Sequence, residues 1–144
     1  MMKAAVIYWT GTGNTETMAQ AVKEGLTIAG AEADLLQFSD ITPDDALAKY
    51  ERLALGCPAM GAEQLEESEV EPFFTELESK LNGRKLALFG SYGWGDGQWM
   101  RDWAERAQAA GAILATGEGL IANEGPDDDA LNACQDLGQD LAKL

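Results

Sequence analysis

The sequence predicts a three-layer α/β fold built on a doubly wound, five-stranded parallel sheet with strand order 2-1-3-4-5. Short apolar runs alternate with segments of helical periodicity, which indicates a parallel sheet covered on both faces. Glycine-rich loops follow several of the apolar runs, as they do after buried strands. Right-handed crossovers leave few other topologies for 144 residues. We therefore expect a single domain over residues 1–144.

The first half of the chain contains two predicted strands and two predicted helices. Lys3–Tyr8 is an apolar run that ends at a Thr/Gly loop, as a buried strand does. Apolar residues recur at helical spacing over Asn14–Ala29, and Gly30 stands where a helix C-cap belongs. Ala33–Phe38 then predicts the second strand, and Ile41–Ala48 predicts a short helix.

The second half of the chain alternates in the same way. A third strand is predicted at Leu53–Gly56 and a fourth at Leu86–Phe89, while a fifth lies within Ala112–Ala122 and is interrupted by glycines. The remaining helices are predicted at Val70–Leu81, Gln98–Ala110 and Asp127–Leu144. The last helix starts in three aspartates, which suit the positive end of a helix dipole.

The composition is that of a soluble globular protein. The chain is 46% hydrophobic and 24% charged, and no run approaches the roughly 18 apolar residues of a membrane span. The first residues lead directly into a strand without a signal-peptide pattern, so we expect a cytoplasmic protein. The formal net charge of −15 argues against nucleic acid and anionic membranes as partners. The charge either favours basic protein partners or only maintains solubility.

Metal chemistry is not expected from this sequence. The chain has no histidine, and its two cysteines, Cys57 and Cys134, are too few for a secreted disulfide framework, a zinc site or an iron–sulfur site. Cys57 ends an apolar run and is most simply a small buried hydrophobic residue.

Ligands of a doubly wound sheet bind beyond the carboxyl ends of its strands. The loop after the first strand consists of Thr10, Gly11, Thr12, Gly13, Asn14 and Thr15. Its glycines allow several N–H groups to point inward at a helix N-terminus, and its side chains add neutral donors. It lacks the lysine of a P-loop, and Glu16 stands where a dinucleotide fingerprint needs glycine. The loop favours the terminal phosphate of a mononucleotide, although a turn that only caps the helix gives the same pattern.

Two further loops at the same edge suggest a site for a flat ring. The loop after the third strand contains Pro58, Ala59, Met60, Gly61, Ala62 and Glu63, and the loop after the fourth contains Ser91, Tyr92, Gly93, Trp94, Gly95 and Asp96. Trp94 stands among glycines, which is typical of a stacking platform. Met60 is a polarizable side chain suited to the opposite face of the ring. Trp99 and Trp103 are expected in the core, and Trp9 has no assigned role.

The combination of these loops resembles the flavodoxins, and among them the short-chain clostridial type. The similarity covers almost the whole chain and rests on Thr10–Thr15, Cys57–Glu63, the acidic run Leu65–Glu69 and Phe89–Asp96. The resemblance implies a low-potential one-electron carrier, not an enzyme, that binds one FMN without a covalent bond. It also implies redox proteins with basic docking surfaces as partners. The long insertion that divides the last strand of long-chain flavodoxins is expected to be absent, and we expect a monomer.

The resemblance further implies roles for individual residues. Thr10–Thr15 would bind the phosphate of FMN with help from Ser91. Met60 and Trp94 would flank the isoalloxazine ring. Glu63 would accept a hydrogen bond from the flavin N3–H.

Two residues depart from the pattern of related short-chain members. Pro58 stands where a serine is common, which removes one possible phosphate donor and a backbone N–H. Ala62 stands where some relatives have a carboxylate, which removes a charge near the ring. The charge missing at Ala62 could shift the potential of the ring.

Two features of the second loop suggest how the potentials are set. Met60–Glu63 is predicted to be a turn with Gly61 at its first central position, whose carbonyl could flip to accept a hydrogen bond from a protonated flavin N5. One carboxylate at about 8 Å, with an effective dielectric of about 40, would cost an anionic reduced flavin roughly 1 kcal/mol. The nearby carboxylates are Glu63, Glu66, Glu67, Glu69 and Glu71, and a solvated approach to the next helix explains them equally well.

Three other classes of protein fit the sequence less well. A flavin or quinone reductase would need a second pocket, and no obvious cluster of lysine or arginine suggests one. A signalling receiver domain would need acidic residues where Tyr8, Trp9 and Cys57 stand. A phosphatase based on Cys57 would need an arginine near the position of Glu63.

Overall fold

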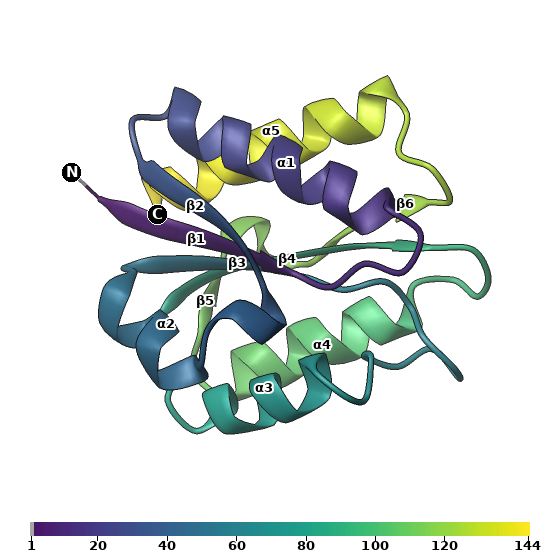
Figure 1. Ribbon diagram of the computed structural model, residues 1–144, viewed down its shortest axis with the longest axis horizontal. Coiled ribbons are helices and arrows are strands. Elements are labelled where there is room, and N and C mark those ends of the chain that lie inside the picture. Colours follow the sequence, from purple (N-terminus) through teal and green to yellow (C-terminus); the bar gives the residue numbers. More distant parts are fainter. Residues whose placement is uncertain (1) are drawn as a thin grey trace.

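A parallel sheet forms the centre of the protein (Figure 1), whose computed structural model describes residues 2–144. Its strands follow the order β2-β1-β3-β4-β5, and β6 also pairs with β4. The strands are β1 (Lys3–Tyr8), β2 (Glu32–Gln37), β3 (Arg52–Gly56), β4 (Lys85–Tyr92), β5 (Ile113–Leu114) and β6 (Leu120–Asn123). The predicted doubly wound order is confirmed.

Two short strands fill the fifth position of the sheet. β5 pairs with the start of β4, and β6 pairs with its end, both in parallel. Between them, Thr116 and Gly117 have φ angles of 64° and 78°. Because this left-handed conformation lies outside the β region, it interrupts the strand. The interruption expected from the glycines is therefore a complete break into two strands.

Helices cover both faces of the sheet, with α1 and α5 on one face and α2, α3 and α4 on the other (Figure 1). Their bounds are α1 (Asn14–Ile28), α2 (Pro43–Lys49), α3 (Val70–Glu78), α4 (Gln98–Ala109) and α5 (Asp128–Lys143). Every helix expected from the sequence is therefore present.

The ends of several helices and strands differ from the prediction, most of them by one residue. α2 begins later than predicted, at Pro43, because the Thr42 hydroxyl caps it by accepting a hydrogen bond from the Asp45 N–H at 3.2 Å. Phe38, predicted to end the second strand, instead opens a 3₁₀ turn. α3 ends at Glu78 and is shorter than predicted. β4 is longer than predicted and runs to Tyr92, so Ser91 and Tyr92, predicted in the loop after the fourth strand, are its last residues at the carboxyl edge of the sheet.

Glycines set the close approach of α1 and α5. A Cβ atom at Gly25 would lie 2.0 Å from the main-chain oxygen of Gln135, and one at Gly138 would lie 2.2 Å from that of Val22. Side chains at these two positions would collide with the backbone of the opposite helix. The two helices therefore depend on both glycines to pack as they do.

The core contains the residues that the sequence placed there. Trp99 and Trp103 are each 1% exposed. Cys57 and Cys134 are free and buried, and burial raises the pKa of each thiol to about 12, so neither is a ready nucleophile. Within residues 2–144, no helix combines the length and the apolar character that a membrane crossing requires.

Candidate functional site

The three loops predicted to form a site meet around one cavity at the carboxyl edge of the sheet. The cavity has a volume of about 390 Å³. It is lined by Trp9, Gly11, Thr12, Asn14, Pro58, Ala59, Met60, Ser91, Tyr92, Gly93, Trp94 and Glu124. The other candidate residues of the same loops are not among the lining residues: Thr10, Gly13, Thr15, Gly61, Ala62, Glu63, Gly95 and Asp96.

The first loop presents neutral donors at the start of α1. Gly13 has a φ of 96°, a conformation that favours glycine, and its N–H donates to the Thr10 hydroxyl at 3.0 Å. The first N–H groups of a helix have no carbonyl partner within it, so those of Asn14 and Thr15 remain available for an anion. The buried hydroxyls of Thr15 and Ser91 lie 2.9 Å apart and join the first loop to the third.

The second loop is a tight hairpin, closed one residue later than predicted. Met60 and Gln64 exchange two backbone hydrogen bonds, of 2.9 and 2.8 Å, so the turn does not close between Met60 and Glu63. Gly61 has a φ of 53° and Glu63 a φ of 51°. Gly61 thus has a positive φ in a hairpin with three residues between its paired ends.

The Glu63 carboxylate joins the second loop to the third. Its Oε1 atom accepts hydrogen bonds from the N–H groups of Asp96 at 3.0 Å and Gly97 at 3.2 Å. A Cβ atom at Gly95 would lie 2.0 Å from the same oxygen, and Gly95 has a φ of 77°. Glycine at this position thus permits the contact between the two loops.

The third loop contains an exposed aromatic side chain. Trp94 is 53% exposed while it lines the cavity, so the indole lies at the rim. Tyr92 is anchored against the buried Trp99, with ring centroids 5.6 Å apart. A rigid base and an exposed rim suit the binding of a flat ring that must remain reachable from outside.

Two lining residues were missed as site residues by sequence reasoning. Trp9 lies at the end of β1, next to the phosphate-type loop, and its nearness to that loop was the available signal. Glu124 follows β6, has a φ of 56°, and donates its N–H to the Tyr92 carbonyl at 2.7 Å. No motif marks Glu124, because the position of its loop depends on the break between β5 and β6.

The glutamates that were grouped in the sequence as carboxylates near the ring have different environments in the structure. Glu66 is buried, and hydrogen bonds from residues 68–70 hold its carboxylate. Glu71 accepts two hydrogen bonds from the Arg106 guanidinium, at 2.8 and 2.9 Å, and this contact lowers the pKa of its carboxyl. Glu69 accepts a hydrogen bond from the Trp9 indole at 2.8 Å. Of these glutamates, Glu67 alone is exposed and has no hydrogen bond or ion pair with another of residues 2–144.

Comparison with known proteins identifies the family. The flavodoxin family model matches residues 6–138. The flavodoxin of Megasphaera elsdenii is 48% identical over 139 residues, which cover 96% of this chain and 97% of the relative. That of Clostridium beijerinckii is 44% identical over 139 residues, covering 96% and 99%. The chain belongs to the flavodoxin family. As a member, it is an FMN-binding electron carrier rather than an enzyme.

Solved flavodoxins agree with the fold described above. The solution structure of two-electron reduced Megasphaera elsdenii flavodoxin matches with a TM-score of 0.86 and 46% identity, covering 98% of this chain and 99% of that one. An archaeal flavodoxin matches with a TM-score of 0.87 and 30% identity, covering 99% and 97%. The near-complete coverage of both chains in these two matches agrees with a short-chain flavodoxin.

The residues of the cavity fit FMN. The buried hydroxyl pair of Thr15 and Ser91 and the free N–H groups at the start of α1 suit a phosphate. The mainly apolar walls, with Met60 and Trp94 among them, suit an aromatic ring system. The cavity thus combines the two kinds of surface that a mononucleotide with a flat ring needs.

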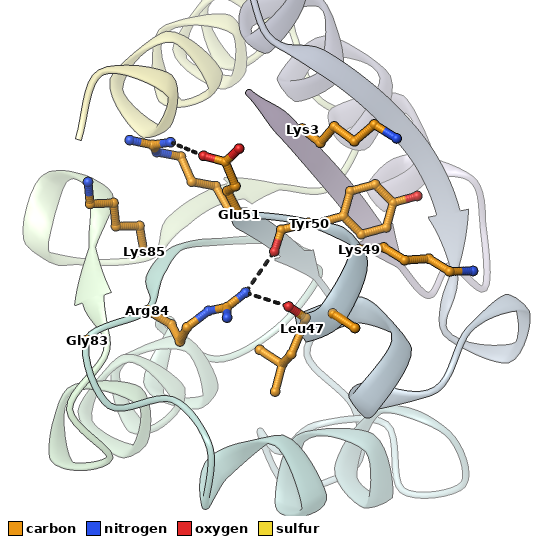
Figure 2. A pocket seen from close by; sticks show the side chains of 10 residues that line it. Lys3, Leu47, Lys49, Tyr50, Glu51, Gly83, Arg84 and Lys85 are labelled. Atoms are coloured by element: carbon orange, nitrogen blue, oxygen red, sulfur yellow. Dashed lines mark hydrogen bonds and ion pairs between the residues drawn. The ribbon is translucent and has the colours of Figure 1, made fainter. Parts of the chain in front are cut away.

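A second, larger cavity lies at the opposite edge of the sheet (Figure 2). Its volume is about 610 Å³, and its lining is Lys3, Leu47, Ala48, Lys49, Tyr50, Glu51, Arg52, Gly83, Arg84 and Lys85. Arg84 donates to the carbonyls of Leu47 and Tyr50 at the end of α2, at 3.1 and 2.7 Å. Lys85 donates to the main-chain oxygen of Leu144 after α5, at 2.7 Å. Arg84 and Lys85 thus satisfy main-chain oxygens at the ends of α2 and α5. No cluster of lysine and arginine was expected from the sequence, and that expectation is wrong, because five of these side chains line this cavity.

Proposed function

We propose that this flavodoxin carries one electron at a time on an FMN held without a covalent bond between the loops after β1, β3 and β4. The observation that carries the proposal is one cavity that combines an uncharged anion-binding loop with apolar walls open at the rim. FMN supplies a ring system that accepts electrons singly. The side chains around it would determine how strongly each redox state is held.

The phosphate of FMN would bind at Thr10–Thr15. The N–H groups at the start of α1 point to where the helix dipole favours an anion. Ser91 would add a donor, since its hydroxyl already lies 2.9 Å from that of Thr15. Fixed neutral donors would replace the lysine of other phosphate loops. Pro58 lines the same cavity without contributing an N–H.

The ring would lie between Met60 and Trp94, which both line the cavity. Glu63 holds its Oε1 atom against the N–H groups of Asp96 and Gly97, and its other oxygen remains to accept the flavin N3–H. The same carboxylate would therefore join the second loop to the third and orient the flavin ring. Gly61, at a φ of 53°, has the backbone freedom that a carbonyl flip toward N5 requires.

The carboxylates would act unequally on the potential for the second electron. Glu67 is exposed and would repel an anionic ring, and the proposal places the Glu63 carboxylate against the ring. The charge of Glu71 is compensated by Arg106 at 2.8 Å. The local charge near the ring is therefore smaller than the five glutamates of the sequence suggest, and the effect should fall mainly on Glu63 and Glu67.

The partners would be redox proteins with basic docking surfaces. The net charge of −15 would steer such proteins toward this chain. Trp94, 53% exposed at the cavity rim, marks the face where electrons would leave. We also propose that the protein works as a monomer in the cytoplasm.

The absorption spectrum of the purified protein, followed by a dithionite titration, tests this function. We expect a yellow protein that releases FMN on denaturation and passes through a long-wavelength absorbance band after one electron. A colourless protein that does not take up added FMN would contradict the proposal.

A further inference from the structure

Trp9 forms a wall of the proposed FMN cavity and is held from behind. Its indole N–H donates to Glu69 Oε2 at 2.8 Å, across 60 positions of sequence. Its backbone N–H donates to the carbonyl of Gly56 at 3.0 Å. A Cβ atom at Gly11 would lie 3.4 Å from the far edge of the indole, so the phosphate loop folds back over the ring. The indole is therefore held at its N–H end and covered at its opposite edge.

Glu69 does not line the cavity, although it is fixed in place. Its backbone N–H donates to Glu66 Oε1 at 2.7 Å, and its carbonyl accepts from the Phe73 N–H at 3.2 Å. These bonds anchor Glu69 at the start of α3. The only cavity residue that its carboxylate contacts by a hydrogen bond, among residues 2–144, is Trp9. The direct contact of the Glu69 carboxylate with the cavity wall is therefore made through the indole.

We propose that Glu69 is a positioning residue, which fixes the Trp9 indole as a wall of the FMN cavity and so joins the phosphate loop to α3. The inference rests on the proposed function, in which this cavity holds FMN. A hydrogen bond from an indole to an ionised carboxylate is stronger than one between neutral groups. A wall ordered before FMN arrives does not have to be ordered on binding, which improves affinity.

The hydrogen bond is one of three side-chain bridges that join the loops. Thr15 and Ser91 join the first loop to the third, at 2.9 Å. Glu63 joins the second to the third through the Asp96 and Gly97 N–H groups. Trp9 and Glu69 join the first loop to the segment that follows the second. Of these bridges, only the last is made by a carboxylate outside the cavity lining and the FMN-binding loops.

Two variants of Glu69 separate position from charge, and a neighbour serves as control. Glu69→Ala removes both the acceptor and the charge, whereas Glu69→Gln keeps an acceptor oxygen and removes only the charge. Glu67→Ala removes one exposed carboxylate two positions away. Trp9→Phe keeps an aromatic wall and removes the indole N–H.

The first measurement is the indole N–H proton resonance of Trp9 in the FMN-free proteins, assigned by its loss in Trp9→Phe. We expect it to move upfield in Glu69→Ala, to move less in Glu69→Gln and to stay in Glu67→Ala. An unchanged resonance in Glu69→Ala would overturn the proposal. This result does not depend on FMN, so it stays interpretable if the wild type fails to bind FMN and the proposed function falls.

The second measurement is the dissociation constant of FMN. Glu69→Ala should weaken binding by about tenfold, while Glu69→Gln and Glu67→Ala should stay within about threefold of the wild type. In the Trp9→Phe background, Glu69→Ala should have almost no further effect, because the donor is already absent. Equal losses of FMN affinity in Glu69→Ala and Glu69→Gln would show that only the charge of Glu69 matters. That result, or additive losses in the double variant, would overturn the proposal.

Discussion

Replacing Glu66 with glutamine perturbs a carboxylate that is only 7% exposed. Its oxygens accept hydrogen bonds from the backbone N–H groups of Ser68 at 2.9 Å, Glu69 at 2.7 Å and Val70 at 3.2 Å, and from the Ser68 hydroxyl. Because these N–H groups lie at the start of α3, no carbonyl within the helix can accept from them. Glu66 thus caps α3 and fixes the segment that follows the second loop.

The magnitude follows from the number of bonds lost. Glutamine keeps one acceptor oxygen and turns an NH₂ group toward the donors that the other oxygen served. A hydrogen bond to a charged group contributes about 1.5–3 kcal/mol, and a lost N-cap costs about 1 kcal/mol. The burial cost of the charge, which Glu66→Gln removes, offsets part of this loss. We expect the free energy of unfolding to fall by about 2 kcal/mol at pH 7.

The effect should depend on pH. Burial acts to raise the pKa of Glu66, but the hydrogen bonds from Ser68, Glu69 and Val70 outweigh it and hold the pKa below its usual value of about 4.3. A carboxyl with a lowered pKa in the folded state stabilises the protein above its unfolded pKa. This contribution is lost as the pH falls through the folded pKa. The difference between wild type and Glu66→Gln should therefore be full near pH 7 and shrink below about pH 4.

Urea unfolding of the FMN-free proteins, followed by tryptophan fluorescence at pH 7 and at about pH 3, measures both effects. Glu67→Gln, at an exposed neighbouring carboxylate, should change the free energy of unfolding by less than about 0.5 kcal/mol and serves as the control. Equal stabilities of wild type and Glu66→Gln at pH 7, or a difference that persists unchanged at low pH, would refute the capping role.

The other predictions concern the packing of α1 and α5 and the ring loops. Gly25→Ala should lower the free energy of unfolding by about 3 kcal/mol, because its Cβ would lie 2.0 Å from a backbone oxygen. Gly93→Ala should leave the free energy of unfolding unchanged, because a Cβ at this position meets open space, and urea unfolding measures both variants. Gly61→Ala should lower the potential for the first electron by about 45 mV, and an unchanged value in a redox titration would argue against the carbonyl flip. Trp94→Ala should weaken FMN binding about tenfold by fluorescence titration, with much of the affinity restored in Trp94→Phe.

The carboxyl-edge loops could be predicted because local patterns and topology agree. In a parallel sheet the carboxyl ends of the strands meet at one edge, so loops far apart in sequence must come together once the strands are identified. Gly13 at φ 96° and Trp94 at the rim follow from short segments that are unusual in themselves. The turn at Gly61 was expected one residue too short, because closure at Gln64 depends on pairing rather than on composition.

The environments of the glutamates after the second loop could not be predicted from the local sequence. In the sequence, Glu66, Glu67, Glu69 and Glu71 form one acidic stretch. In the structure they respectively cap a helix, face solvent, hold an indole and pair with Arg106. Each environment depends on which element packs against α3, and no spacing within the stretch contains that information.

The sequence by itself determined the strand order, the anion-binding loop without lysine, the aromatic platform and, through its motifs, the family. These features depend on periodicity, glycine conformation and residues that are neighbours along the chain. Only the tertiary structure decided that Trp9 is a cavity wall held by Glu69, that Glu63 bridges two loops and that Glu124 borders the site. Those contacts join residues far apart in the chain, so they exist only after the sheet has brought its loops to one edge.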